Sequence, residues 1–480
     1  MVVAAVLFGL AAQQLFFARA AGLNVLVATG LFLSIGWTLR PRTVRPDAAD
    51  AWLPVAAVTF GALAALRADP AVVAFDALAA GTLGLTWIAA LGGARITRSD
   101  ARSLAAEAAD GIAGIVDRPV RLVARATGPI GAFVRSRTGR LPRYAGGAAL
   151  AVPFLGAFSI LFASADPIYA QRVTDLFDVV RWRDLFRDAG QRTALFAVIA
   201  WLAAAALATL ERSREGRART ELRGVISAET TVVLLAAVDL LFAVFVAVQV
   251  GYLFGGRDTV DAAGIPYSAY ARRGFFELMA SASIAGAMLF ALGLQSRTRS
   301  RVTIALGLVL VALTMVVLVS AWYRLDLYQL AYGWTELRFY ALAGIVFLGL
   351  ALAVLGWSVS AGRMRLALQP LVAAALLVGI GVNALSPSAF VARADLERLI
   401  DPSGLPADAE RRMDPAYLVS LGDGAFPVLI ELLPELRWDD RNLLAAWLQW
   451  TARGRAGARH PWESLSVDRL RAQSALDGLR

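Results

Sequence analysis

The chain has 480 residues, of which 58% are hydrophobic and 18% charged, and its mean hydropathy is +0.61. These values are typical of a membrane protein with many helices and exclude an ordinary soluble protein. Because the chain has no cysteine and no lysine, disulfides, thiolate metal sites, Schiff-base chemistry and a Walker lysine are excluded. The only histidine, His460, lies in the polar C-terminal stretch, so no spanning helix can use histidine as a ligand or proton relay.

The net charge of +10 is unevenly distributed along the chain. Residues 384–480 contain 12 arginines and 14 acids, which leaves 35 arginines and 23 acids before residue 384. Arginines in short loops between spans set topology and bind anionic headgroups. We therefore expect the lipid bilayer, with its anionic headgroups, to be the partner of the arginine-rich loops, and we expect no nucleic-acid partner.

Apolar runs of spanning length predict an all-α fold, a polytopic transmembrane helix bundle with about eleven spans. The first run resembles a signal peptide, but it lacks a basic n-region and is interpreted as a span. The predicted spans are residues 2–17, 22–39, 51–66, 71–91, 144–162, 193–210, 230–250, 275–294, 302–322, 339–357 and 366–383. We therefore divide the chain into a helix bundle, residues 1–383, and a C-terminal helical tail, residues 384–480.

Loop arginines predict the orientation of the chain. Alternate loops contain 23 arginines on one side and 12 on the other, which puts the N-terminus in the cytoplasm and the tail outside a multi-pass cell membrane protein. The loop 92–143 has ten arginines and four acids. It is interpreted either as a docking surface for anionic lipid or a cytoplasmic protein partner, or as a topology signal with an interfacial helix at 101–117.

Polar stretches on the predicted outer side have three patterns. Residues 166–186 show the spacing of an amphipathic interfacial helix. Residues 256–274 favour an ordered turn, and residues 323–338 a polar, aromatic connection. In the tail, helical periodicity covers 415–433, 441–452 and 467–476. The tail tryptophans suit an aromatic interfacial belt or ordinary core packing; they are Trp438, Trp447, Trp450 and Trp462.

Ionisable residues within spans are candidate functional residues. Asp239 lies in a run whose thirteen Val, Leu and Phe residues favour insertion by about 6 kcal/mol in sum, against about 3 kcal/mol for the acid. It either has a function or fixes helix packing through a buried carboxyl group. Gln249, ten residues further, lies about 15 Å away along the helix and cannot contact Asp239. Asp76 lies near an end of its span.

Charged residues near the predicted outer rim form a second group. Glu277 opens a span next to Arg272 and Arg273, which favours a local ion pair over a proton site. Glu336 and Arg338 lie among tyrosines and Trp334, a pattern typical of a ligand vestibule or of interfacial anchoring. We predict no catalytic residue, metal site or cofactor.

Several motifs resemble those of the uncharacterised bacterial polytopic family called domain of unknown function 4173, and of its sibling 4153. The motifs are LLFAVFVAVQ at 240–249, YLFGG at 252–256, YARRGFFEL at 270–278, LFASADP at 161–167, YGWTELRFY at 332–340, and a tail pattern of Tyr417, Leu418, Leu421, Asp423, Ala425 and Pro427. The resemblance covers residues 145–480. It implies a multi-spanning architecture and supplies no activity.

Two functions remain from this pattern. A membrane interaction, sensing or scaffold protein needs a stable bundle, an outer domain and an arginine-rich inner loop. A secondary transporter of a small solute or lipid needs related halves, broken helices and midplane charges. A membrane enzyme is the least favoured, third interpretation, because an intramembrane hydrolase needs an acid pair on adjacent spans and Asp239 has no evident partner.

Overall fold

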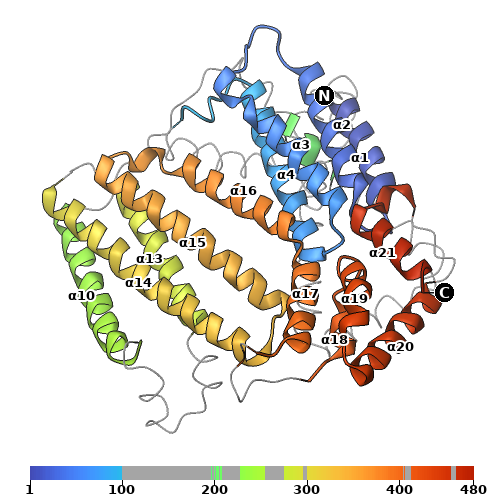
Figure 1. Ribbon diagram of the computed structural model, residues 1–480. Coiled ribbons are helices and arrows are strands. Elements are labelled where there is room, and N and C mark those ends of the chain that lie inside the picture. Colours follow the sequence, from blue (N-terminus) through green and yellow to red (C-terminus); the bar gives the residue numbers. More distant parts are fainter. Residues whose placement is uncertain are drawn as a thin grey trace, which may run out of the picture. The chain divides into compact units, whose positions relative to one another are not determined.

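The computed structural model describes residues 1–99, 228–253, 275–295, 300–403, 405, 412–455 and 461–479, with isolated positions between 196 and 207. Within these ranges every regular element is a helix (Figure 1). Several predictions lie outside the described residues: the span 144–162, more than half of the span 193–210, most of the loop 92–143, and the segments 166–186 and 256–274. The chain divides into two compact units.

The first unit contains α1 (Val2–Phe16), α2 (Leu23–Leu39), the short helix η1 (Ala48–Asp50), the first part of α3 (Trp52–Leu66) and the second part of α4 (Pro70–Leu91). Two fully buried polar side chains form hydrogen bonds with backbone atoms in the turns of this unit. Asn24 donates to the carbonyl of Leu15 at 3.0 Å and accepts from the backbone of Gly22 at 2.8 Å. Asp50 accepts from the backbone of Ile96 at 3.1 Å. Both polar groups therefore satisfy backbone atoms that turns leave open.

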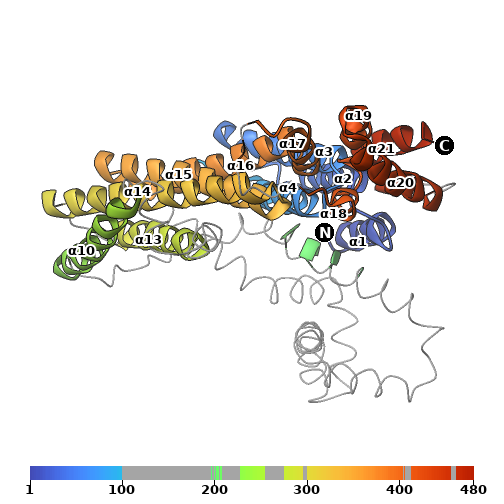
Figure 2. The same cartoon turned by 60° about the horizontal axis from the view of Figure 1, so that its bottom comes forward.

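The second unit contains Ala62–Ala79, Thr97–Ala105 and everything from Thr220 on. Its bundle consists of α10 (Ala228–Leu253), α13 (Phe275–Gln295), α14 (Arg301–Tyr332), α15 (Glu336–Ala361) and α16 (Leu368–Leu385), with η3 (Met364–Leu366) before α16. α14 packs against α10, α13 and α15, and α15 packs against α16 (Figures 1 and 2). Leucine, valine and alanine fill the interior, among them Leu235, Leu289, Leu310, Val317 and Leu352.

The bundle helices present apolar side chains outwards as well as inwards. On α10, Val233, Leu240 and Leu241 are 66–69% exposed, and on α14 Val319 is 58% exposed. An apolar exterior of this extent is unfavourable in water, whereas it is compatible with surrounding lipid tails. Five described helices are long and apolar enough to cross a membrane, and α1, α2 and parts of α10 and α13 are shorter apolar helices. The nine helices lie in nine of the eleven predicted runs.

The connection between α14 and α15 differs from the prediction. A polar, aromatic connection over 323–338 is wrong, because α14 continues to Tyr332 and only Gly333, Trp334 and Thr335 connect it to α15. The polar side chains after residue 322 keep helical spacing. Gly333 ends α14 with a φ of +76°, and Thr335 caps α15 by accepting from the backbone of Arg338 at 3.3 Å. Short polar runs at a span end thus extend the helix beyond the apolar stretch.

The tail consists of α17 (Pro387–Ile400), α18 (Pro415–Ser420), α19 (Phe426–Leu432), η4 (Leu433–Glu435), α20 (Trp438–Gly454), η5 (Trp462–Ser464) and α21 (Val467–Asp477). The segment predicted to have helical periodicity, 415–433, contains two helices, because Gly422, with a φ of +80°, separates α18 from α19. α17 had no predicted counterpart. The tail core includes Val391, Leu396, Phe426 and Leu444, and Phe339 of α15 packs in the same cluster.

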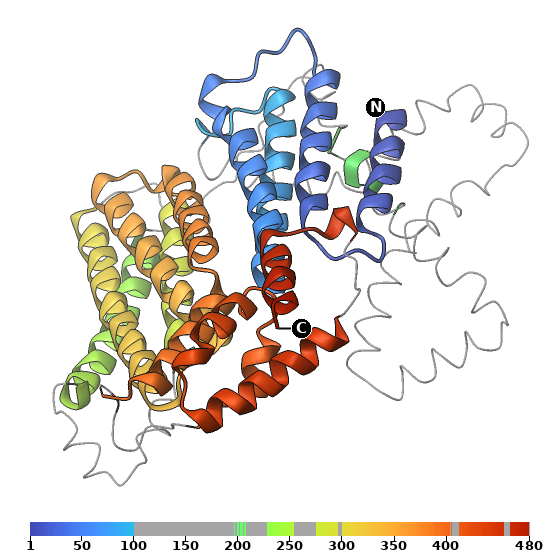
Figure 3. The ribbon, with the colours of Figure 1, turned by 45° about the vertical axis from the view of Figure 1, so that its right-hand side comes forward.

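Contacts in the second unit sort the helix ends into two groups. The tail helices lie at the end of the bundle where α14 ends and α15 begins (Figure 3). At the other end, the side chain of Gln369 donates to the carbonyls of Thr97 and Ser99 at 2.8 and 3.0 Å, and a Cβ on Gly293 would meet Met364. From α13 to α16, the beginnings and ends of successive spans therefore alternate between the two ends.

Candidate functional site: a polar cluster at the span ends

Buried and half-buried polar side chains gather where the spans of the second unit meet the tail. The cluster draws on the ends of α3 and α16, the beginnings of α4 and α15, and the tail helices α17, α18 and α21. We call it the polar cluster, and its members are Arg67, Asp69, Asp76, Glu336, Arg338, Tyr340, Asn383, Asp395, Arg398, Tyr417 and Asp468. All of them belong to one compact unit.

The beginning of α4 supplies two acids. Asp69 caps the helix, since its Oδ1 accepts from the backbone N–H of Ala71 at 2.9 Å and of Val72 at 3.3 Å, while Pro70 at the first helical position has no N–H that would need an acceptor. Asp76 follows seven residues later, which is about two turns, so both acids lie on the same face of α4. Asp76 is fully buried and its Oδ1 accepts from Nδ2 of Asn383 at 2.9 Å.

Arg67 joins the spans to the last helix of the chain. Its Nη1 lies 3.3 Å from Oδ1 of Asp468, and its Nη2 donates to the backbone carbonyl of Asn383. The backbone N–H of Ala68 donates to Oδ2 of Asp468 at 3.2 Å. Both side chains are mostly buried, at 16% and 6% exposure. Burial raises the pKa of Asp468, and Arg67 opposes that rise, so the ion pair offsets the cost of burying the carboxylate.

The tail also holds the connection between α14 and α15. Oδ1 of Asp395 on α17 accepts from the backbone N–H of Trp334 at 2.7 Å. A Cβ on Gly333 would lie 2.8 Å from the same oxygen, so glycine is needed there both for its φ and for this close approach. The hydroxyl of Tyr417 on α18 accepts from the backbone N–H of Glu336 at 3.1 Å. Burial raises the pKa of Tyr417 to about 12.

Two arginines complete the end of α14. Arg398 of α17 donates to the carbonyls of Gln329, Leu330 and Ala331 at 3.0, 2.6 and 2.8 Å. These carbonyls belong to the last turn of α14, where the helix itself leaves acceptors open and its dipole favours a cation. Arg338 donates to the carbonyls of Tyr332 and Gly333 and lies 4.1 Å from the centre of the Tyr328 ring.

Several buried polar atoms of the cluster have no hydrogen-bond partner among the described residues. They are Nε of Arg67, Oδ2 of Asp69, Oδ2 of Asp76, Oη of Tyr340 and Oδ1 of Asn383. Glu336 and Tyr340, one turn apart on α15, lie within electrostatic reach of Asp69. Buried unpaired acceptors are costly and uncommon. Oxygens dominate this set, so the cluster has spare capacity to accept protons or hydrogen bonds.

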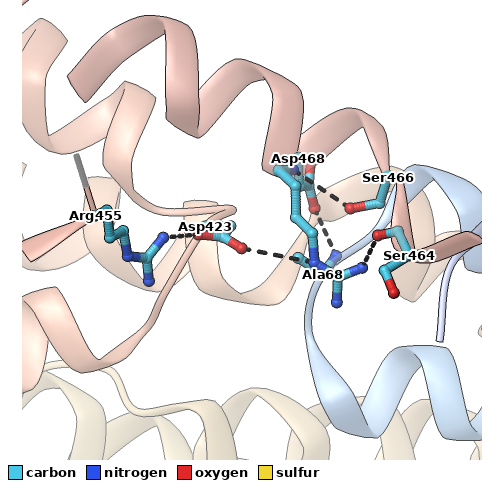
Figure 4. A network of polar contacts seen from close by, with 7 residues as sticks. Ala68, Asp423, Arg455, Ser464, Ser466 and Asp468 are labelled. Atoms are coloured by element: carbon cyan, nitrogen blue, oxygen red, sulfur yellow. Dashed lines mark hydrogen bonds and ion pairs between the residues drawn. The ribbon is translucent and has the colours of Figure 1, made fainter. Parts of the chain in front are cut away.

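A second polar network secures the tail helices to one another. Asp423 forms an ion pair with Arg455, which follows α20 (Figure 4). The Oδ2 atom of Asp423 also lies 3.8 Å from Nε of Arg469 on α21. Arg469 also donates to the carbonyl of Ser464. Figure 4 shows Asp468, on the same helix, next to Ala68. The network therefore connects α20 and α21 to the point where Asp468 contacts the spans.

The residues proposed from the sequence are partly brought together. Asp76, Glu336 and Arg338 all belong to the polar cluster. Asp239 does not: it lies on α10, is 6% exposed, and neither carboxylate oxygen has a partner among the described residues. The side chains of Gln249 and Glu277, and all of Arg272 and Arg273, lie outside the described residues.

Sequence reasoning missed most of the cluster's members. Arg67 was counted only as a loop arginine, and Asp395, Arg398 and Asp468 were counted only as polar tail residues. A local signal was present for Asp69, because an aspartate directly before Pro70 is a strong helix-start pattern. Asn383 is a polar residue at the end of an apolar run. For the tail residues no local pattern exists, since their partners lie far away in the chain.

The pH dependence of stability should depend on Asp395. Burial raises the pKa of its carboxyl group from 3.8 to about 6, against the opposing effects of the Trp334 N–H, Arg398 and Arg338. The folded state then binds more protons than the unfolded state between pH 4 and 6, so stability falls as pH rises through this window. The free energy of unfolding should drop by about 1–3 kcal/mol, allowing for partial exposure.

Thermal unfolding in mild detergent between pH 4 and 8 measures this effect. Asp395→Asn keeps an oxygen for the Trp334 N–H, so the variant should fold and show a smaller decrease than the wild type. Glu397→Gln, on the exposed side of the same helix, should show the full decrease. A decrease of unchanged size in Asp395→Asn would assign the titration to other groups.

The described part of the chain is thus a helical protein with apolar helices of membrane-spanning length and a polar cluster at one end of them. A family model described as domain of unknown function (DUF4153) matches residues 54–432. The chain belongs to this family. Of the two sibling families that the motifs resemble, 4153 is the one that matches, and the label 4173 is not confirmed. No curated protein and no solved structure matches the chain.

Proposed function

We infer that the protein is a membrane-embedded interaction or sensing protein, in which the tail receives a signal or partner and the spans respond. The observation that carries this proposal is the direct attachment of the tail to three span ends. Asp468 contacts the residues before α4, and Asp395 and Arg398 contact the residues around Gly333. A partner that moves the tail would therefore pull on α4, α14 and α15 through buried charged contacts rather than through a flexible linker.

The proposed topology has eleven spans, a cytoplasmic N-terminus and an extracytoplasmic tail, residues 384–480. The alternation of helix ends in the second unit supports it, and loop arginines give the absolute direction. The chain contains no cysteine, so single cysteines can report the side directly. A cysteine replacing Arg393 should react with an impermeant maleimide in intact cells, whereas one replacing Thr43 should react only after permeabilisation.

The proposed inner partners bind through arginine. The loop 92–143 would contact anionic headgroups or a cytoplasmic protein, and this role rests on its ten arginines. A sensing protein needs such an output surface on the side opposite to its receiving domain. We therefore assign the output to this loop and the input to the tail.

The experiment compares partner recovery with solute uptake. The wild-type protein is extracted with its surrounding lipid in polymer-bounded native nanodiscs. These nanodiscs should contain a protein partner at a fixed molar ratio to the wild-type chain. Arg67→Ala, which removes the ion pair between α21 and the residues before α4, should reduce the recovery of that partner at a temperature where the variant is still folded. If Arg67→Ala recovers as much partner as the wild type, or if no partner is recovered at a fixed ratio, the sensing proposal is contradicted.

A secondary transporter is the second candidate function, because buried carboxylates on α10 and α4 have unpaired oxygens among the described residues. Intramembrane acids commonly carry protons in transporters. Proteoliposomes on a solid-supported membrane would then give a proton-coupled current with a transported solute, and Asp239→Asn would abolish it without unfolding the protein. Such a current would favour transport over sensing.

A further inference from the structure

The helix α20 has two apolar faces, and the tail core covers only one. Leu444, Leu448 and Ala452 are at most 1% exposed and face the core of the tail. The other apolar face, which we call the tryptophan face, consists of Leu443, Trp447 and Trp450, at 48, 37 and 70% exposure. Their spacing of i, i+4 and i+7 places them in one stripe.

The tryptophan face has a continuous aromatic surface. The rings of Trp447 and Trp450 lie 6.2 Å apart at 72° to each other, so they form one continuous aromatic surface. A third face of α20 carries the exposed polar side chains Asn442, Gln449 and Arg453, and Trp438, at 76% exposure, lies one turn before Asn442. Neither tryptophan packs in the tail core. Of the two roles that the sequence left open for the tail tryptophans, core packing therefore does not apply to these two.

The position of α20 is fixed relative to the spans of the second unit. Arg455 at its C-terminal end pairs with Asp423, and the adjoining network reaches Asp468, which contacts the residues before α4 (Figure 4). α20 also runs across the direction of α14 and α15, in Figure 1 and again in Figure 3. A helix that crosses the spans at their ends has the direction expected of a helix lying along a membrane surface.

The membrane surface is the environment that suits these side chains. Tryptophan is enriched where its apolar rings meet acyl chains and its N–H meets headgroups and water. Amphipathic helices bind this zone with their apolar face buried and basic residues near the headgroups. Exposed arginines stand before α20, in its first turn and in its last turn, namely Arg437, Arg441 and Arg453.

We propose that the tryptophan face of α20 inserts into the headgroup–acyl boundary of the leaflet on the tail's side. The tail then rests on the bilayer through α20 and on the spans through the polar cluster. The occupant of this face is lipid rather than a protein, because the tail is attached to the ends of the spans and the bilayer surface adjoins it there. This inference rests on the attached tail and does not depend on a sensing role.

Site-directed spin labelling of the full chain tests the proposal. Because the protein has no cysteine, Trp450→Cys and Leu443→Cys each place one nitroxide on the tryptophan face. Gln449→Cys and Asn442→Cys are matched controls on the polar face of the same helix. Each variant is reconstituted in nanodiscs of phosphatidylcholine and phosphatidylglycerol, and collision rates with oxygen and with a water-soluble nickel chelate are compared.

The expected result is a higher oxygen-to-nickel collision ratio at 443 and 450 than at 442 and 449, lost when the nanodisc is replaced by a nonionic detergent with a short polar headgroup. Equal ratios on both faces would overturn the proposal and leave the face in water. Low collision rates with both reagents at 443 and 450 would also overturn it, since a second protein would then cover the face. If Trp450→Cys does not fold, Leu443→Cys with its control decides the question.

Discussion

Replacing Arg67 by alanine should lower the free energy of unfolding by about 3–5 kcal/mol, because the substitution leaves the buried carboxylate of Asp468 without its cation. Arg67 and Asp468 are only 16% and 6% exposed, with Nη1 and Oδ1 3.3 Å apart. Solvent cannot replace the lost partner at such burial. The loss of the bond from Arg67 to the Asn383 carbonyl adds to the effect. Thermal unfolding in mild detergent measures the change in the free energy of unfolding.

Arg393→Ala is the matched control for this variant. Arg393 pairs with Glu431 at 3.0 Å, but these side chains are 42% and 59% exposed, so its loss should cost about 0–1 kcal/mol. The double variant Arg67→Met with Asp468→Leu removes both charges and should recover much of the loss. If Arg67→Ala destabilises no more than Arg393→Ala, the ion pair does not hold the tail.

The substitution of Arg398 by alanine should lower the free energy of unfolding by about 2–5 kcal/mol. It leaves the carbonyls of Gln329, Leu330 and Ala331 without the cation that now donates to all three, and each hydrogen bond to a charged group contributes about 1.5–3 kcal/mol. The negative end of the α14 dipole loses its complement as well. Because α14 packs against three neighbours, fraying of its last turn reaches the bundle.

Limited proteolysis and thermal unfolding report this effect together. Arg398→Ala should expose the connection after Tyr332 to protease, whereas Arg393→Ala, on the same helix but exposed, should not. Arg398→Lys should recover only part of the stability, since an ammonium group cannot match the planar fork that reaches three carbonyls. Protease resistance equal to that of Arg393→Ala would show that the cap is dispensable.

The sequence predicted the helices of the bundle well and the polar cluster poorly. Apolar run length alone located α4 and α16, because spanning requires about twenty apolar residues whatever the neighbours are. It failed for α14 beyond residue 322, where polar side chains continue a helix that Arg398 stabilises from elsewhere. It also failed for α17, whose mixed composition resembles a loop.

Long-range pairing explains the gap in the site prediction. Asp76 was singled out by its position in a span, yet its partner Asn383 is 307 residues away. The identity of a partner at that distance leaves no trace in local periodicity or spacing. Glu336 and Arg338 were likewise found by composition, while Tyr417, 81 residues further, was not. Burial marks such residues as candidates, and only the fold pairs them.

The contact between Arg67 and Asp468 also sets an order of events during synthesis. The two residues are separated by 401 positions, so at about 5–20 residues per second Arg67 emerges roughly 20–80 seconds before its partner exists. During that time the turn between α3 and α4 has a cation without its partner carboxylate. Assembly of this corner of the protein can finish only when α21 has been translated, so a chain that stops before α21 leaves the Arg67 guanidinium without its carboxylate.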